Sequence, residues 1–186
     1  MGRTTHVHHA RRPARTAMTD ARRIALAMVA LVAVLVAVPS QASAASLVPF
    51  QATVAETFTL APCAPVPSLC VSTMGSGHAT HLGQIDEAAA AVVDLASHAG
   101  PGCFSETRTT TLTAASGDQL TLDATGHNCA IGATTVTAMD AYVVTGGTGR
   151  FSGARGGGTI TATIDLASGT AVVTFRGLLS SPGALR

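Results

Sequence analysis

The chain contains no lysine and no tryptophan, and its 186 residues include one tyrosine and five phenylalanines. Six of the eleven arginines precede residue 45, so residues 45–186 carry five arginines and nine acids, which gives a net charge of −4. Binding to phosphates needs clustered basic residues, and stacking on bases needs aromatic side chains. We therefore expect no nucleic-acid partner and no binding to lipid headgroups.

The long apolar run is confined to residues 24–38, directly after an arginine pair at residues 22–23. A basic segment, a short apolar run and a small-x-small site, here Ala42-Ser43-Ala44, are together typical of a secretory signal peptide. Spanning a bilayer takes about 20 apolar residues, so an uncleaved membrane anchor is the less favoured alternative. We predict that residues 1–44 are a helical signal peptide of the Sec type, cleaved near Ala44, whose first 17 residues are an overlong gene start. The mature protein is then secreted and has no membrane partner.

Two segments, residues 104–114 and 118–128, predict a β-hairpin, because apolar residues and threonines alternate along both of them. Gly117 suits the left-handed position of a three-residue hairpin loop. Pairing Ala114 with Asp118 makes one face of the hairpin mainly apolar and the other face polar. A slip of one residue would mix the two faces, so the pattern fixes this register.

All four cysteines follow the predicted cleavage site, and an exported chain meets an oxidising environment, so we predict two disulfides. The hairpin register places Cys103 opposite Cys129, within disulfide reach. Cys63 and Cys70 are then left to close the proline-rich loop between them. No C-x-x-C pair occurs, so a zinc site is disfavoured and we predict neither a metal nor a cofactor.

The rest of the chain after residue 44 consists of β-patterned segments separated by Gly, Pro and Ser. The strand candidates are residues 48–60, 79–95 with an interruption, 104–114, 119–126, 133–145, 158–166 and 170–180. The last two form a second hairpin around Ser168-Gly169, with Ile164 opposite Val173. Alanines favour a helix over residues 87–96, but the valines and the β context favour a strand. Strands at this spacing predict one antiparallel sandwich or barrel domain over residues 45–186.

A glycine-rich stretch at residues 144–156 is the most distinctive motif. It fits neither glycine pattern of nucleotide-binding loops, and it precedes a strand rather than a helix. Gly146, Gly147 and Gly149 can adopt positive φ where a strand leaves its sheet, and Phe151 can plug the end of a barrel. A structural turn is therefore the favoured interpretation.

The run Gly-Gly-Thr-Gly-Arg-Phe-x-x-Ala-Arg-Gly at residues 146–156, which includes Arg150, resembles the corresponding turn of dirigent proteins and of the allene oxide cyclase barrel. The Gly-x-Ala-Thr-His-Leu-Gly segment at residues 77–83 resembles small exported bacterial proteins of unknown role. The resemblance implies an all-β, eight-stranded antiparallel barrel with a hydrophobic lumen. In the plant proteins that lumen binds or steers a reactive apolar intermediate. Their functional side chains do not align with this sequence, so their chemistry is not carried over.

Four polar residues are candidates for binding a ligand in such a lumen. The hairpin register sets Glu106 and Arg108 on the apolar face, where they could orient a polar ligand group or transfer a proton. The alternative for this pair is an ion pair at the rim of the barrel. Asp140 and Tyr142 share one face of a strand, and Tyr142 is the obvious hydroxyl donor unless it only packs in the barrel.

Three functions are open at this point. The first is non-catalytic binding of a small apolar molecule in the lumen, which is favoured because no nucleophile, metal site or acid–base pair is assembled. The second is an isomerase or cyclase that steers a reactive apolar intermediate by confinement, with Glu106, Arg108 and Tyr142 as polar groups. The third is a cell-surface interaction protein, which would expose a large apolar patch in place of a lumen.

Overall fold

The computed structural model describes residues 46–180 of the chain. The predicted signal peptide and its cleavage site lie outside the described residues. Within residues 46–180, no helix is long and apolar enough to cross a membrane.

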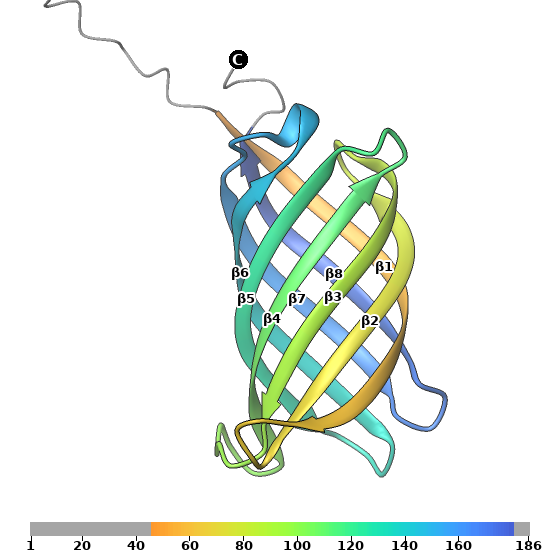
Figure 1. Ribbon diagram of the computed structural model, residues 1–186, viewed down its shortest axis with the longest axis vertical. Coiled ribbons are helices and arrows are strands. Elements are labelled where there is room, and N and C mark those ends of the chain that lie inside the picture. The colour runs from red at the N-terminus through yellow and green to blue at the C-terminus, as the bar shows by residue number, and fades with distance from the viewer. Residues whose placement is uncertain (1–45, 181–186) are drawn as a thin grey trace, which may run out of the picture. The chain divides into compact units, whose positions relative to one another are not determined.

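Eight antiparallel strands close into a barrel in simple chain order, each pairing with the next and the last with the first (Figure 1). This strand order confirms the eight-stranded antiparallel barrel that the resemblance implied. Closure pairs both sides of every strand and removes exposed edges. The strands are β1 (Leu47–Cys63), β2 (Ser68–Ala79), β3 (Gly83–Asp94), β4 (Cys103–Ala114), β5 (Gln119–Ala130), β6 (Thr135–Gly147), β7 (Gly156–Asp165) and β8 (Thr170–Ser180).

Strand periodicity decides the inner and outer faces of the barrel, because successive side chains point to opposite sides. In β4 the buried residues Glu106, Arg108, Thr110 and Leu112 alternate with more exposed threonines and a serine. The alanine-rich segment follows the same rule, since β3 pairs with β2 and β4 along its length. The β context therefore overrides the helical preference of alanine, as predicted.

The second strand was not predicted from the sequence. The interrupted strand that we expected over residues 79–95 corresponds to β3 and the tight turn before it, where His81 and Gly83 have positive φ. The strand that precedes this turn, β2, was missing from the prediction. Gly75 and Gly77 weaken the strand pattern of β2 because they have no side chain to alternate. An added Cβ at Gly77 would lie 1.9 Å from the backbone oxygen of Thr53, so close strand packing requires this glycine.

The two predicted hairpins have different outcomes. The first has the predicted register, with Leu112 opposite Leu120, and Gly117 has a φ of 86°. The second is wrong by two residues, because Ile164 pairs with Ala171 rather than with Val173. A four-residue turn replaces the predicted two-residue turn. A shift of two leaves every side chain on its original face, so the apolar pattern cannot detect it.

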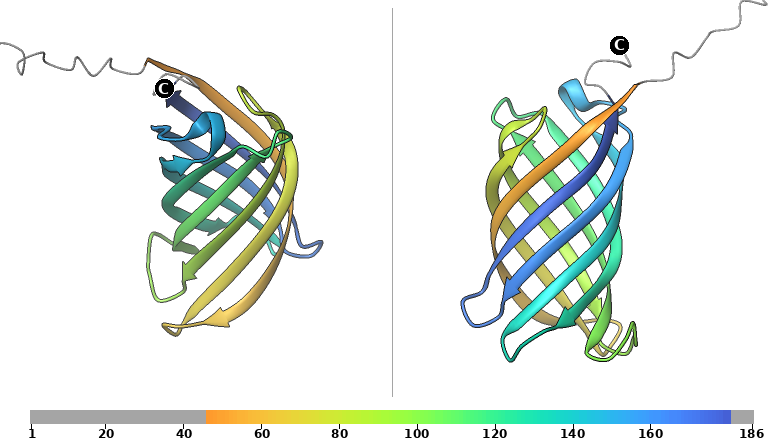
Figure 2. Two further views of the ribbon diagram at one scale, coloured as in Figure 1. Left: turned by 45° about the horizontal axis from the view of Figure 1, so that its top comes forward. Right: turned by 180° about the vertical axis from the view of Figure 1, so that it is seen from behind.

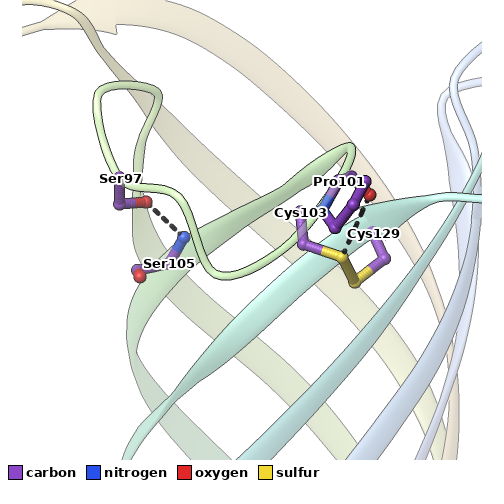
Figure 3. The surroundings of a disulfide bond; sticks show 5 residues. All are labelled: Ser97, Pro101, Cys103, Ser105 and Cys129. Atoms are coloured by element: carbon purple, nitrogen blue, oxygen red, sulfur yellow. Dashed lines mark hydrogen bonds between the residues drawn. A yellow bond between two sulfur atoms is a disulfide. The ribbon is translucent and has the colours of Figure 1, made fainter.

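Both predicted disulfides are confirmed. Cys63 and Cys70 join β1 to β2 with 5.7 Å between their Cα atoms, and Cys103 and Cys129 join β4 to β5 with 4.1 Å. Figure 3 shows the second bridge beside the β3–β4 loop, where the backbone N–H of Ser105 donates to Ser97 Oγ at 2.6 Å. The bridge thus fixes the end of the hairpin that the loop leads into.

The two ends of the barrel differ. The end that we call the closed end carries the β2–β3, β4–β5 and β6–β7 loops, with the short 3₁₀ helix η1 (Gly149–Phe151) in the last of them (Figure 2). Phe151 is 1% exposed and packs in the core at this end. Gly149 has a φ of 57°, but Gly146 and Gly147 do not have positive φ, so that part of the prediction is wrong.

A different constraint explains Gly147. An added Cβ there would lie 2.5 Å from the backbone oxygen of Gln119 and 2.8 Å from Phe151 Cβ. Arg150 covers the plug from outside, with its guanidinium carbon 5.0 Å from the centre of the Phe151 ring. Its Nε lies 3.5 Å from Asp118 Oδ2, so the glycine-rich turn is tied to the β4–β5 loop.

We predict that the two disulfides differ in their contribution to stability. In the chain-entropy account, closing the longer loop between Cys103 and Cys129 contributes about 3.5 kcal/mol, against about 2.5 kcal/mol for the loop between Cys63 and Cys70. Serine pairs replacing each bridge separately, compared by urea unfolding, should therefore differ by about 1 kcal/mol. Equal losses, or a larger loss for the Cys63–Cys70 bridge, would contradict this ranking.

Candidate functional site

The lumen is packed at the closed end and hollow toward the other end, which we call the open end. Large buried side chains such as Phe50, Ile85, Leu120 and Phe151 fill the closed half. The open half holds a cavity of about 290 Å³. Its wall is apolar, and includes Phe58, Leu60, Leu69, Val71, Leu95, Phe104, Val136, Ile164 and Leu166. Small apolar ligands fit such sites, which combine an apolar wall with a few polar groups.

Arg108 holds the polar floor of this cavity together. Its Nη2 donates to Glu56 Oε1 at 2.6 Å and to Glu87 Oε1 at 2.7 Å. Its Nε donates to Thr110 Oγ1 at 3.0 Å. These three charged side chains come from β1, β3 and β4, and all are buried. Loss of one partner from a buried ion pair leaves a charge without compensation, so the three residues depend on one another.

A glycine makes room for the two glutamates. Gly75 of β2 lies between Glu56 and Glu87 in the strand register, opposite both of them. An added Cβ at Gly75 would lie 3.0 Å from Glu56 Cγ and 2.5 Å from the backbone oxygen of Ala55. Because Gly75 has no side chain, the carboxylates of Glu56 and Glu87 on either side of it can both reach Arg108.

The same arrangement recurs on the opposite side of Arg108. Gly126 of β5 lies between Glu106 and Asp140 in the register. An added Cβ at Gly126 would lie 2.2 Å from Asp140 Oδ1. Asn128 Nδ2 donates to Glu106 Oε2, while Asp140 Oδ1 and Asn128 Oδ1 are buried and have no hydrogen-bond partner. The carboxylates of Glu106 and Asp140 therefore have fewer hydrogen-bond and ion-pair partners than those of Glu56 and Glu87.

Burial raises the pKa of three carboxyl groups in the lumen. Desolvation raises the pKa of Glu56 to about 7, against the opposing effect of Arg108. Desolvation, assisted by the charge of Glu106, raises the pKa of Asp140 to about 7. Desolvation also raises the pKa of Glu106, although Asn128 and Arg108 oppose the shift. Near neutral pH the floor therefore presents carboxyl groups that can either donate or accept a proton.

Three of the four predicted site residues, Glu106, Arg108 and Asp140, line the cavity. Tyr142 does not line it. Its ring packs edge-on against Phe175 at 6.3 Å between centroids, and its hydroxyl has no hydrogen-bond partner. Burial raises the pKa of Tyr142 to about 12, so this phenol stays protonated. The roles predicted for these residues in ligand binding remain predictions.

The pairing of Arg108 differs from the alternative drawn from the sequence. We considered an ion pair between Glu106 and Arg108 at the rim, whereas Arg108 pairs inside the barrel with two glutamates of other strands. Glu56 and Glu87 were missed. Each of these glutamates occupies a position that alternation assigns to the inner face of its strand. An isolated charged residue is usually read as a surface residue, so the local pattern did not identify them as buried.

The arrangement limits the chemistry that the site can perform. All four cysteines are in disulfides, so no thiolate nucleophile lines the cavity. Among residues 46–180, no group of three or more His, Cys, Asp or Glu side chains is placed to hold a metal ion. Binding and orienting a small molecule, and exchanging a proton with it, are the capabilities that this floor supports.

No family model and no curated protein matches the chain. Among solved structures, the chain is similar to the pterocarpan synthase dirigent protein GePTS1, with 14% identity and a TM-score of 0.45. The match covers 72% of this chain and 89% of that chain.

We predict that Asp140 lowers stability at neutral and higher pH. Its pKa is about 7 in the folded protein against 3.8 as the ordinary value, so the folded state loses stability as pH rises between these values. Asp140→Asn should then be more stable than the unaltered protein at pH 8, on the order of 2–4 kcal/mol, and close to it at pH 4. Urea unfolding across this pH range measures the difference.

The matched control for this prediction is Asp123→Asn. Asp123 lies on the outer face of the barrel, exposed to solvent, so the same chemical change there should leave the pH dependence of unfolding unaltered. A constant difference between Asp140→Asn and the unaltered protein from pH 4 to pH 8 would contradict the raised pKa of Asp140.

Proposed function

We propose that this protein binds a small, mainly apolar molecule in the open half of its lumen, with a polar group of that molecule on the floor. One observation carries the proposal: an apolar cavity of about 290 Å³ ends on Glu56, Arg108, Asn128 and Asp140, four buried polar residues. A cavity that only filled space in the fold would not need polar groups at its base, because each of them costs desolvation free energy.

The surface supports binding in the lumen over a role in surface recognition. The third function from the sequence required an exposed apolar patch in place of a lumen. The described chain has a lumen, and on its outer wall the exposed Met139 and Val172 share a hollow with four threonines rather than a continuous apolar patch.

The proposal places the protein outside the cell. Two disulfides in a chain of this size suit an oxidising compartment. They also suit a signal peptide at residues 1–44, which the sequence predicts. Export would expose the open end of the barrel to molecules of the extracellular medium or the cell surface.

Catalysis by confinement is the second candidate function, and the raised pKa of Asp140 favours it. A carboxyl group with a pKa of about 7 is suited to proton transfer at neutral pH. Asp140 would exchange the proton, while Glu106 and Arg108 would orient the substrate. Tyr142, which the sequence suggested as a polar group, does not line the cavity and has no place in this scheme.

We predict that filling the cavity weakens binding. Ala91 of β3 faces the lumen and lines the cavity, so the Phe ring in Ala91→Phe would occupy the space of the ligand. The affinity for octanol, followed by titration calorimetry, should fall at least about tenfold, the equivalent of about 1.4 kcal/mol of lost contact.

The neighbouring residue provides the control. Ala90 points to the exposed outer face of the same strand, so Ala90→Phe adds the same ring outside the barrel and should leave octanol binding unchanged. Loss of binding in both variants, or in neither, would contradict binding in the lumen.

For the second candidate, we predict that Asp140→Asn traps a substrate. The unaltered protein and the variant would each be purified from the culture medium of the producing cells, and bound small molecules would be extracted. Isomerisation predicts compounds of equal mass but different chromatographic retention, because the variant lacks the group that moves the proton. Recovery of one identical compound from both proteins would instead show binding without chemistry.

A further inference from the structure

The polar atoms around the cavity are unequally satisfied. Asn128 Oδ1 and Asp140 Oδ1, both hydrogen-bond acceptors, are buried without a hydrogen-bond partner in the described part of the chain. Both residues line the cavity, and Asp140 is 3% exposed. Because buried polar atoms in native proteins are almost always hydrogen-bonded, two unpaired acceptors in one cavity favour a ligand group that donates.

Several hydrogen-bond donors of the floor are engaged inside the protein. Arg108 directs Nη2 to Glu56 and Glu87 and Nε to Thr110. Asn128 directs its amide nitrogen to Glu106. A ligand group that only accepts hydrogen bonds, such as a carboxylate, would have to compete with the acids for these donors or bind at Arg108 Nη1, where the same acids would repel it.

The charges of the floor also favour a ligand group that donates hydrogen bonds, and they favour one with a positive charge. The buried charged residues of the described chain are four acids, Glu56, Glu87, Glu106 and Asp140, and one arginine, Arg108. Above the pKa of about 7 that Glu56 and Asp140 share, the acids outnumber the single guanidinium, and with all five groups ionised the net charge is −3. In a lumen with a low effective dielectric constant, this charge attracts a cation and repels an anion. No metal site among residues 46–180 supplies that cation.

We infer that the molecule bound in the lumen is an amphiphilic amine, with its apolar body against the cavity wall and its ammonium group at Asn128 and Asp140. An ammonium group offers three donors, no acceptor and one positive charge, which match the two free acceptors and the excess of acids. An alcohol offers one donor and no charge, and a carboxylate offers acceptors alone. The inference rests on the proposed function, since it assigns the polar group of the ligand already placed in this cavity.

The test compares three probes that share one apolar chain: octylamine, octanol and octanoate. Titration calorimetry on the secreted protein would be done at pH 8, above the pKa of about 7 of Asp140, where an alkylamine with a pKa near 10.4 stays charged. The expected order of affinity is amine, then alcohol, then carboxylate. Octylamine should exceed octanol by about ten- to hundredfold, the usual effect of a charge-assisted hydrogen bond.

Variants locate the effect on the floor of the cavity. Asp140→Asn keeps the shape of the side chain but removes its charge, so it should reduce the preference for octylamine over octanol about tenfold. Asp123→Asn, on the outer wall, changes the net charge of the protein by the same amount and should keep the preference. Circular dichroism of both variants checks that the barrel remains folded.

Each outcome has a distinct meaning. If octanol binds but octylamine binds no tighter, or if octanoate binds as tightly as octylamine, the inference is overturned and the proposed function stands. If none of the three probes binds, the proposed function fails, and the inference with it. A preference for octylamine that survives in Asp140→Asn would also overturn the inference, because the selectivity would then come from elsewhere on the protein.

Discussion

The buried contact of Arg108 with Glu56 and Glu87 is the interaction on which the interior of this barrel depends. It joins side chains of β1, β3 and β4 in the middle of the lumen, where no backbone pairing connects β1 to β3 or β4. On the side of the closed end the barrel is filled by large apolar side chains, and on the side of the open end the lumen is hollow. Two carboxylates that share one guanidinium in this geometry therefore set the depth of the cavity.

Glycines on intervening strands allow the acids to occupy the lumen. Gly75 lies between Glu56 and Glu87, and Gly126 lies between Glu106 and Asp140, so two rows of the inner wall read acid, glycine, acid. A side chain at either glycine would collide with backbone oxygens as well as with the neighbouring acid. The two rows differ in how far their carboxylates are paired. Arg108 donates to both acids of the first row, while Asp140 in the second row keeps an unpaired oxygen.

The sequence predicts what alternation and turn chemistry control, and it misses what depends on distant strands. The register of the first hairpin was predicted because a slip of one residue would reverse its faces, and this register also located the Cys103–Cys129 bridge. The second hairpin was wrong by two residues, a shift that leaves the faces unchanged. Glu106 and Arg108 were placed on the inner face for the same reason of alternation. Their partners were not predicted, because Glu56 lies 52 residues from Arg108 and only barrel closure brings them together.

The division of the lumen into a packed half and a hollow half also explains how the fold tolerates a site that lowers its stability. Leaving a buried polar atom unpaired costs about 1–3 kcal/mol, and three such atoms lie inside the described barrel, on Asn128, Asp140 and Tyr142. Each fully buried Leu, Ile or Phe side chain contributes about 1.5–3 kcal/mol, and the closed half contains several. The packed half can therefore offset the cost of the hollow half. A barrel selected only for stability would carry an apolar residue in place of Asp140, so an acid beside an apolar cavity supports the proposal that this cavity receives a ligand.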